Sequence, residues 1–153
     1  MNILALDLGS NCGFAVKRGG FIESGVVNFT PKARESKGMR FVRFSVWLEE
    51  ILDAQKPSLV VYEMAHNRGG SATEVLNGMV AFVQAECEKR EIDYTSVHSG
   101  TLKKFAIGKG NASKELMVSE ARKRLKKDLE DDNEADALWI MEWSKKEFRN
   151  GKA

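Results

Sequence analysis

The order of strand-like and helix-like segments is the feature of this sequence that most limits its fold. Three short segments with strand periodicity come first, and Gly19-Gly20 between the second and third predicts a β-hairpin. Strands and helices then alternate. The predicted strands are 2–8, 12–17, 21–29, 58–64 and 92–97, and the predicted helices are 36–55, 71–90, 102–107, 113–127 and 131–148. This order predicts an α/β protein with a five-stranded mixed sheet, the first three strands antiparallel and helices on both faces.

The length and composition predict one domain over residues 1–153, with a short tail after about residue 148. No apolar run approaches the roughly 20 residues that span a bilayer, and no basic segment precedes the first apolar run, so we expect neither a membrane segment nor a signal peptide. Cys12 and Cys87 lie far apart without a CxxC pattern. This pattern favours a reducing, cytoplasmic location and argues against a zinc site.

Three acids lie in apolar surroundings. Asp7 ends the first predicted strand, Glu63 ends the fourth, and Asp136 follows Ala135 within an apolar helical segment. Carboxylates gathered at one edge of a sheet would repel each other unless a cation joined them. Mg2+ takes oxygen ligands, and two such ions about 4 Å apart can hydrolyse a phosphodiester. The three acids therefore predict a metal site.

The segment before Asp136 holds several candidates for a fourth ligand. Asp131 and Glu134 fit a capping box, which predicts Asp131 as the N-cap of the last helix. Asp132 and Asn133 share a helix face with Asp136. We favour Asp132 as the fourth ligand and keep Asn133 as a neutral alternative, while a role of Asp132 in complementing the helix dipole stays open. A second capping box, Ser71 to Glu74, predicts a helix start at Ser71.

Basic residues gather in two further regions. Lys103, Lys104, Lys109 and Lys114 flank a glycine-containing loop that could hold phosphates. Arg68 lies in a polar loop between the fourth strand and the next helix. We expect either that Arg68 contacts DNA or that the loop only connects the two elements. For the basic run 122–127 we favour a structural role as a solvated helix end, with cations near the C-terminal carbonyls. Trp47, Trp139 and Trp143 are expected in the core.

Four segments in order carry a family resemblance: Leu6-Asp7-Leu8-Gly9-Ser10, Val61-Tyr62-Glu63, the lysine-rich segment 99–114, and Glu134-Ala135-Asp136-Ala137-Leu138. They resemble the RuvC family of Holliday-junction resolvases, over residues 2 to about 143. The short chain and the sequence from Asp131 to Asp136 are more similar to phage-encoded members, which implies the host cytoplasm.

The resemblance implies a ribonuclease-H-like fold in which the first and fourth strands are neighbours. It also implies a homodimer that cuts four-way DNA junctions with Mg2+, for which Mn2+ substitutes, and that uses no nucleotide cofactor. By position, Asp7, Glu63 and Asp136 match metal ligands of the family, and Lys103 and Lys114 match lysines near the scissile phosphate. Two positions differ from the family pattern: Asn133 stands where an acid or histidine is usual, and His66 stands where bacterial members carry an aromatic residue.

Two other functions are compatible with these features. One is a non-catalytic module that binds branched DNA, which predicts a missing acid. The other is a ribonuclease-H-like nuclease of the YqgF type that acts on RNA. The segment Gly108 to Lys114 favours the resolvase.

Overall fold

The sheet has the strand order β3-β2-β1-β4-β5 in a computed structural model that describes residues 1–64 and 69–149. The strands are β1 (Ile3–Asp7), β2 (Asn11–Arg18), β3 (Phe21–Asn28), β4 (Leu59–Glu63) and β5 (Asp93–Val97). β2 pairs antiparallel with β1 and β3, whereas β4 runs parallel to β1 and β5 parallel to β4. The predicted five-stranded mixed sheet is confirmed.

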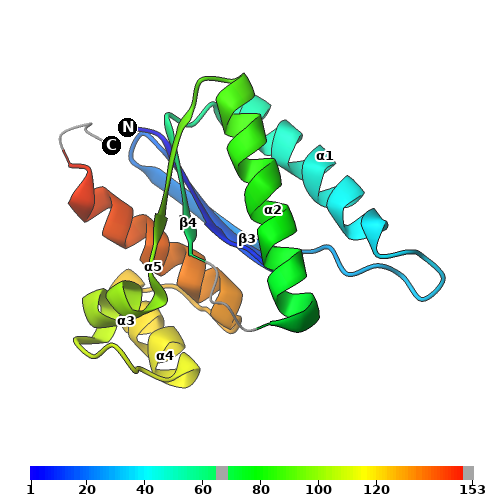
Figure 1. Ribbon diagram of the computed structural model, residues 1–153. Helices are drawn as coiled ribbons and strands as arrows, with labels where there is room; N and C mark the ends of the chain where they lie inside the picture. The colour runs from blue at the N-terminus through cyan, green and yellow to red at the C-terminus, as the bar shows by residue number, and fades with distance from the viewer. Residues whose placement is uncertain (65–68, 150–153) are drawn as a thin grey trace.

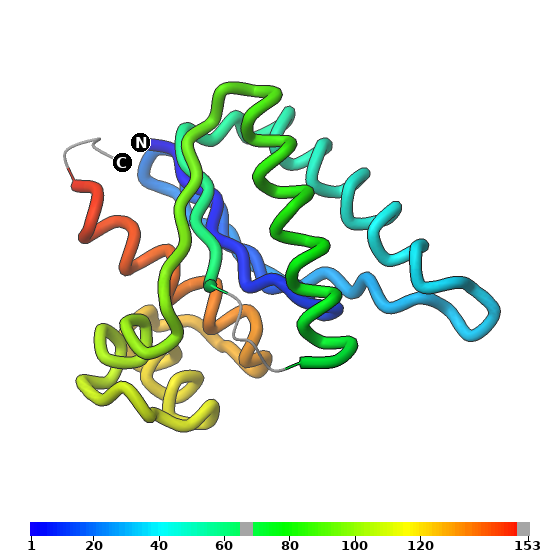
Figure 2. The backbone as a smooth tube through the Cα atoms, in the orientation of Figure 1, coloured from blue at the N-terminus to red at the C-terminus, as the bar shows by residue number. Residues whose placement is uncertain are grey.

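Helices cover both faces of this sheet, as predicted (Figure 1). They are α1 (Gly38–Gln55), α2 (Gly70–Lys89), α3 (Ser99–Ile107), α4 (Lys114–Leu125) and α5 (Asp132–Glu147). α1 and α2 lie on one face, while α5 crosses the other with α3 and α4 beside it; the tube in Figure 2 shows the same layers. Within residues 1–64 and 69–149, no helix has both the length and the apolar character needed to cross a membrane.

The alternation of side chains along β1 divides the core in two. Ile3 and Ala5 are buried against α5, whereas Leu4 and Leu6 are buried against α1 and α2. A strand covered on both faces reads as a continuous apolar run, which is why β1 shows no polar alternation. The next residue in the series of Ile3 and Ala5 is Asp7, so its carboxylate lies on the α5 face.

The turn between β2 and β3 is the predicted hairpin. Arg18 is paired with Phe21 across the two strands, so Gly19 and Gly20 form the whole connection. Gly19 has φ +61°, a left-handed conformation that glycine adopts without steric cost.

The predicted start of α2 at Ser71 is wrong by one residue. α2 begins at Gly70, its N-cap is Gly69, and no side chain caps it. Gly69 and Gly70 both have φ +69°, a left-handed conformation, so the chain turns into the helix at these two glycines and Ser71 lies inside the first turn without capping it. α3 also begins earlier than predicted, at Ser99.

Gly13 on β2 allows α5 to approach the sheet closely beside Asp7. Gly13 is the antiparallel partner of Asp7. A Cβ atom at Gly13 would lie 1.9 Å from the main-chain oxygen of Asn133. The start of α5 therefore rests on a backbone without a side chain, next to one of the three acids.

We expect Gly13→Ala to lower the free energy of unfolding by about 1–3 kcal/mol, because a methyl group there overlaps backbone that cannot rotate away. Urea denaturation measures the change. Gly100→Ala is the matched control, because a Cβ at Gly100 meets open space. Equal unfolding midpoints for Gly13→Ala and the wild type would contradict the close approach of α5.

Candidate metal centre

The pairing of β1 with β4 brings Asp7 and Glu63 together. Ala5 is the parallel partner of Val61, and each acid follows two residues later on its strand. Since alternate residues share a face, both carboxylates lie on the α5 side of the sheet. Asp136 reaches the same point from α5. One carboxylate oxygen from each of the three acids lies within 4.8 Å of the other two.

Asp132 and Asn133 line the same cavity as the three acids, at the start of α5. Asp132 lies 3.6 Å from the Nζ atom of Lys114, and its side chain is 38% exposed. Among the described residues, the acids that meet within 4.8 Å are Asp7, Glu63 and Asp136. The helix spacing thus places Asp132 and Asn133 on the predicted face, at the rim of the cluster, and the fourth ligand stays a prediction.

Burial and mutual repulsion raise the proton affinity of the cluster. The pKa of Asp7 lies well above its usual range, first because of burial and then because of the charges of Asp136 and Glu63. Burial, followed by the charges of Glu63 and Asp132, raises the pKa of Asp136 to about 7. Lys114 opposes the shift at both acids. A cation at this point would replace the bound protons and relieve the repulsion.

The donor set fits a hard divalent cation. The three converging side chains offer carboxylate oxygens only, the ligands that Mg2+ and Mn2+ prefer. The nearby thiol of Cys12 is fully buried, and burial together with the Asp7 charge raises its pKa far above the usual range. The side chain of Cys12 packs in the half of the core under α1 and α2, on the other side of the sheet from the three acids, so it adds no soft ligand to the site.

Two lysines form a cationic wall of the cavity. Lys103 projects from α3, and Lys114 is the first residue of α4. The hydroxyl of Ser113 accepts a hydrogen bond from the Leu116 N–H and fixes the start of α4. Leu102 and Met117 are buried under the two helices and also line the cavity. The lysines therefore stand on an anchored pair of helices beside the acids.

Two further predicted DNA contacts, Lys104 and Lys109, lie outside this cavity. Lys104 and Lys109 are exposed and do not line the cavity in the part of the chain that the structure describes. Arg68 and His66 fall outside the described residues.

The basic run 122–127 makes contacts that favour the structural role predicted for it. Arg122 donates to the Leu129 carbonyl, and the guanidinium of Arg124 lies 5.3 Å from the ring centroid of Trp139.

Trp139 is 1% exposed, and Trp47 and Trp143 pack against the two halves of the core, as expected for all three.

The start of α5 is held by one contact that the sequence predicts and by others that it does not reveal. Asp131 caps the helix by accepting hydrogen bonds from the N–H groups of Asn133 and Glu134, which confirms the predicted N-cap. The side chain of Glu134 does not return this bond as a capping box requires. It accepts a hydrogen bond of 2.7 Å from Ser24 on β3 and lies 3.2 Å from the Nζ atom of Lys127.

The raised pKa of Asp136 predicts how the free energy of unfolding depends on pH. Burial and the neighbouring charges raise the pKa of Asp136 from its ordinary value of 3.8 to about 7 in the folded protein. Between these pH values the folded state binds more protons, so the free energy of unfolding falls as pH rises through this window. In metal-free buffer above pH 7 we expect Asp136→Asn to raise the free energy of unfolding by about 1–3 kcal/mol, an advantage that is lost near pH 4.

Urea denaturation at both pH values, with chelator present, measures this difference. Asp128→Asn removes an exposed charge between α4 and α5 and serves as the control. Addition of Mg2+ at pH 8 is expected to stabilise the wild type more than Asp136→Asn. A variant less stable than the wild type at both pH values would contradict the proposed repulsion.

Comparison with solved structures identifies related folds. Thermus thermophilus RuvC in complex with a Holliday junction substrate is 21% identical, with a TM-score of 0.74, over 92% of this chain and 90% of that chain. The yeast mitochondrial Holliday junction resolvase is 16% identical, with a TM-score of 0.60, over 97% and 83%. The fowlpox virus resolvase in complex with Holliday junction DNA is 12% identical, with a TM-score of 0.59, over 94% and 99%.

No family model matches the sequence, and no curated protein matches it. The likeness to the solved structures is therefore a likeness of fold, and it confirms the architecture that the resemblance implied. This chain has the ribonuclease-H-like fold of RuvC and related Holliday junction resolvases.

Proposed function

We propose that this protein is an endonuclease that resolves four-way DNA junctions by paired, metal-dependent hydrolysis of phosphodiesters. The observation that carries the proposal is the group of three carboxylates, drawn from β1, β4 and α5, in a cavity with a lysine wall. Acids so close together repel one another unless they bind protons or a cation, and the adjacent lysines attract an anion. A phosphodiester bound through a divalent metal satisfies both.

Different residues of the chain would bind the metal and the DNA. Asp7, Glu63 and Asp136 would hold Mg2+, or Mn2+ in its place, and Asp132 or Asn133 would complete the ligand set. When bound, the metal would activate a water for in-line attack and stabilise the departing oxygen. Lys103 and Lys114 would hold the scissile phosphate against the acids by charge-assisted hydrogen bonds. Lys104 and Lys109 would contact the DNA farther from the reacting phosphate, and we propose Arg68 as a further DNA contact.

The choice of branched DNA as substrate rests on the neighbours. Two of the similar structures are complexes with Holliday junction DNA. Paired cuts across a junction need two active sites, so we propose a homodimer. α2 is suited to that contact, because Leu76 and Val80 are only partly buried against the core beneath them. A phage-encoded origin and a cytoplasmic location are part of the same proposal.

The cluster of three acids argues against a non-catalytic binding module. Such a module would have no reason to keep three carboxylates in mutual repulsion, and Asn133 replaces an acid only at the rim of the cavity. A ribonuclease-H-like nuclease that acts on RNA would use the same three acids. A comparison of cleavage of DNA junctions and of RNA therefore distinguishes the two nucleases.

Cleavage of a synthetic four-way junction in Mg2+ tests the proposal. We expect Asp7→Asn and Asp136→Asn each to slow single-turnover cleavage by about 1000-fold or more, because several kcal/mol of metal stabilisation are lost. Junction affinity should change little. Asp93→Asn, at the exposed start of β5, is the control and should cut normally.

Wild-type protein that binds junctions but cuts in neither Mg2+ nor Mn2+ would exclude a nuclease. Equal cutting of linear duplex would show that the resolvase assignment is too narrow. Preferential cutting of RNA would favour the alternative nuclease.

A further inference from the structure

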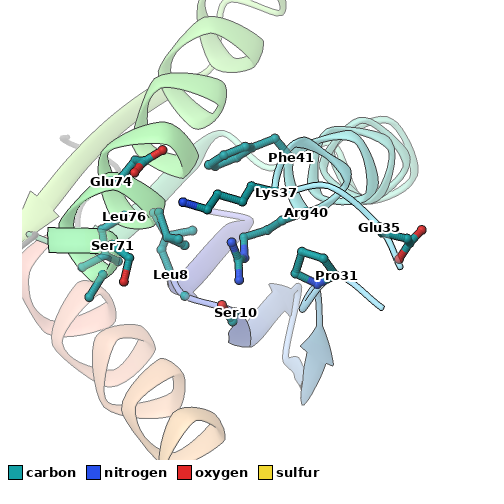
Figure 3. A pocket seen from close by; sticks show the side chains of 13 residues that line it. Leu8, Ser10, Pro31, Glu35, Lys37, Arg40, Phe41, Ser71, Glu74 and Leu76 are labelled. Atoms are coloured by element: carbon teal, nitrogen blue, oxygen red, sulfur yellow. The ribbon is translucent and has the colours of Figure 1, made fainter. Parts of the chain in front are cut away.

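A second cavity lies beside the carboxylate cavity and has a volume of about 540 Å³. It is formed by the connection from β1 to β2, the segment before α1, and the first turns of α1 and α2 (Figure 3). Leu8 and Leu76 line both cavities, so the two share a wall. A chain molecule bound at the acids would therefore reach this second cavity with its neighbouring units.

Two cations from the start of α1 reach into the second cavity. Figure 3 shows the side chain of Arg40 extending toward Ser10 and that of Lys37 toward Leu8 and Leu76. The Nε atom of Arg40 is buried, and it has no hydrogen-bond partner among the described residues. A buried guanidinium donor without an acceptor is costly. The arrangement therefore suits an anionic ligand that accepts hydrogen bonds.

The acids that line this cavity do not cancel its positive charge. The carboxylate of Glu35 forms an ion pair and a hydrogen bond with Arg43, outside the lining. That leaves Glu74 on α2 as the unpaired acid among the described lining residues, against the two cations. The hydroxyls of Ser10 and Ser71 add neutral donors.

We propose that this second cavity binds a backbone phosphate of the DNA strand that is cut, through Arg40 and Lys37. The inference rests on the proposed function and deepens it. Lys103 and Lys114 line the carboxylate cavity from α3 and α4, and Arg40 and Lys37 line the second cavity from the start of α1. Figure 1 shows α3 and α4 on one side of the molecule and α1 on the other. A strand centred on the acids is thus held at phosphates on both sides. The guanidinium matches phosphate geometry with paired donors, and Lys37 adds a mobile charge.

The salt dependence of DNA affinity tests this inference. A phosphate contact releases counterions, so its loss reduces the slope of log K against log salt by about 1. We expect Arg40→Gln and Lys37→Gln each to weaken junction binding by about 3- to 10-fold at low salt and to reduce this slope. Fluorescence anisotropy with a labelled four-way junction, in chelator so that no cutting occurs, measures both.

Lys56→Gln is the matched control, since it removes an exposed charge just beyond the other end of α1 and should leave the slope unchanged. Lys37 is exposed, so its variant tests the site even if Arg40→Gln unfolds. Arg40→Lys should recover part of the slope.

An unchanged slope in both variants would overturn the inference, even if the wild type cuts junctions. A reduced slope in a protein that never cuts would support the phosphate site and refute the proposed nuclease. Absence of DNA binding by the wild type would overturn both.

Discussion

The repulsion among Asp7, Glu63 and Asp136 is the interaction to which the rest of the site responds. Apolar packing forces these charges together: β1 and β4 pair in parallel at the centre of the sheet, and α5 is buried across that pair. The raised pKa values of Asp7 and Asp136 reflect the unfavourable free energy of burying these charged carboxylates close together. Lysines at the cavity wall lower it only in part, and a divalent cation would remove it.

The acids at the start of α5 show how neighbouring residues of one type take different roles. Asp131 caps the helix, Asp132 faces Lys114 at the cavity rim, and Glu134 ties the helix to β3 through Ser24. Asp136, one turn farther on, is left to join the cluster. The tie to β3 holds the start of α5 against the sheet, and with it the position of Asp136 relative to the acids of the sheet.

Much of this arrangement can be read from the sequence, and the reasons are local. The uninterrupted apolar runs of β1 and β4 mark buried strands, and an acid that ends such a run is conspicuous. The neighbouring position of these two strands came from the family resemblance, because periodicity does not define strand order. The capping pattern at Ser71 failed because the glycine pair before it starts α2 earlier.

Other features depend on residues that are distant in sequence. The roles of Gly13 and Ser24 follow from the docking of α5, which no local pattern encodes. The sequence around Arg40 indicates only an ordinary helical residue, because its place in a cavity depends on how α1 packs beside α2. The most direct test of the account is calorimetric titration of the metal-free protein with Mn2+ near pH 7, in buffers of different ionisation enthalpy. The account predicts binding with proton release, both lost in Asp7→Asn. Binding without proton release, or unaffected by Asp7→Asn, would contradict it.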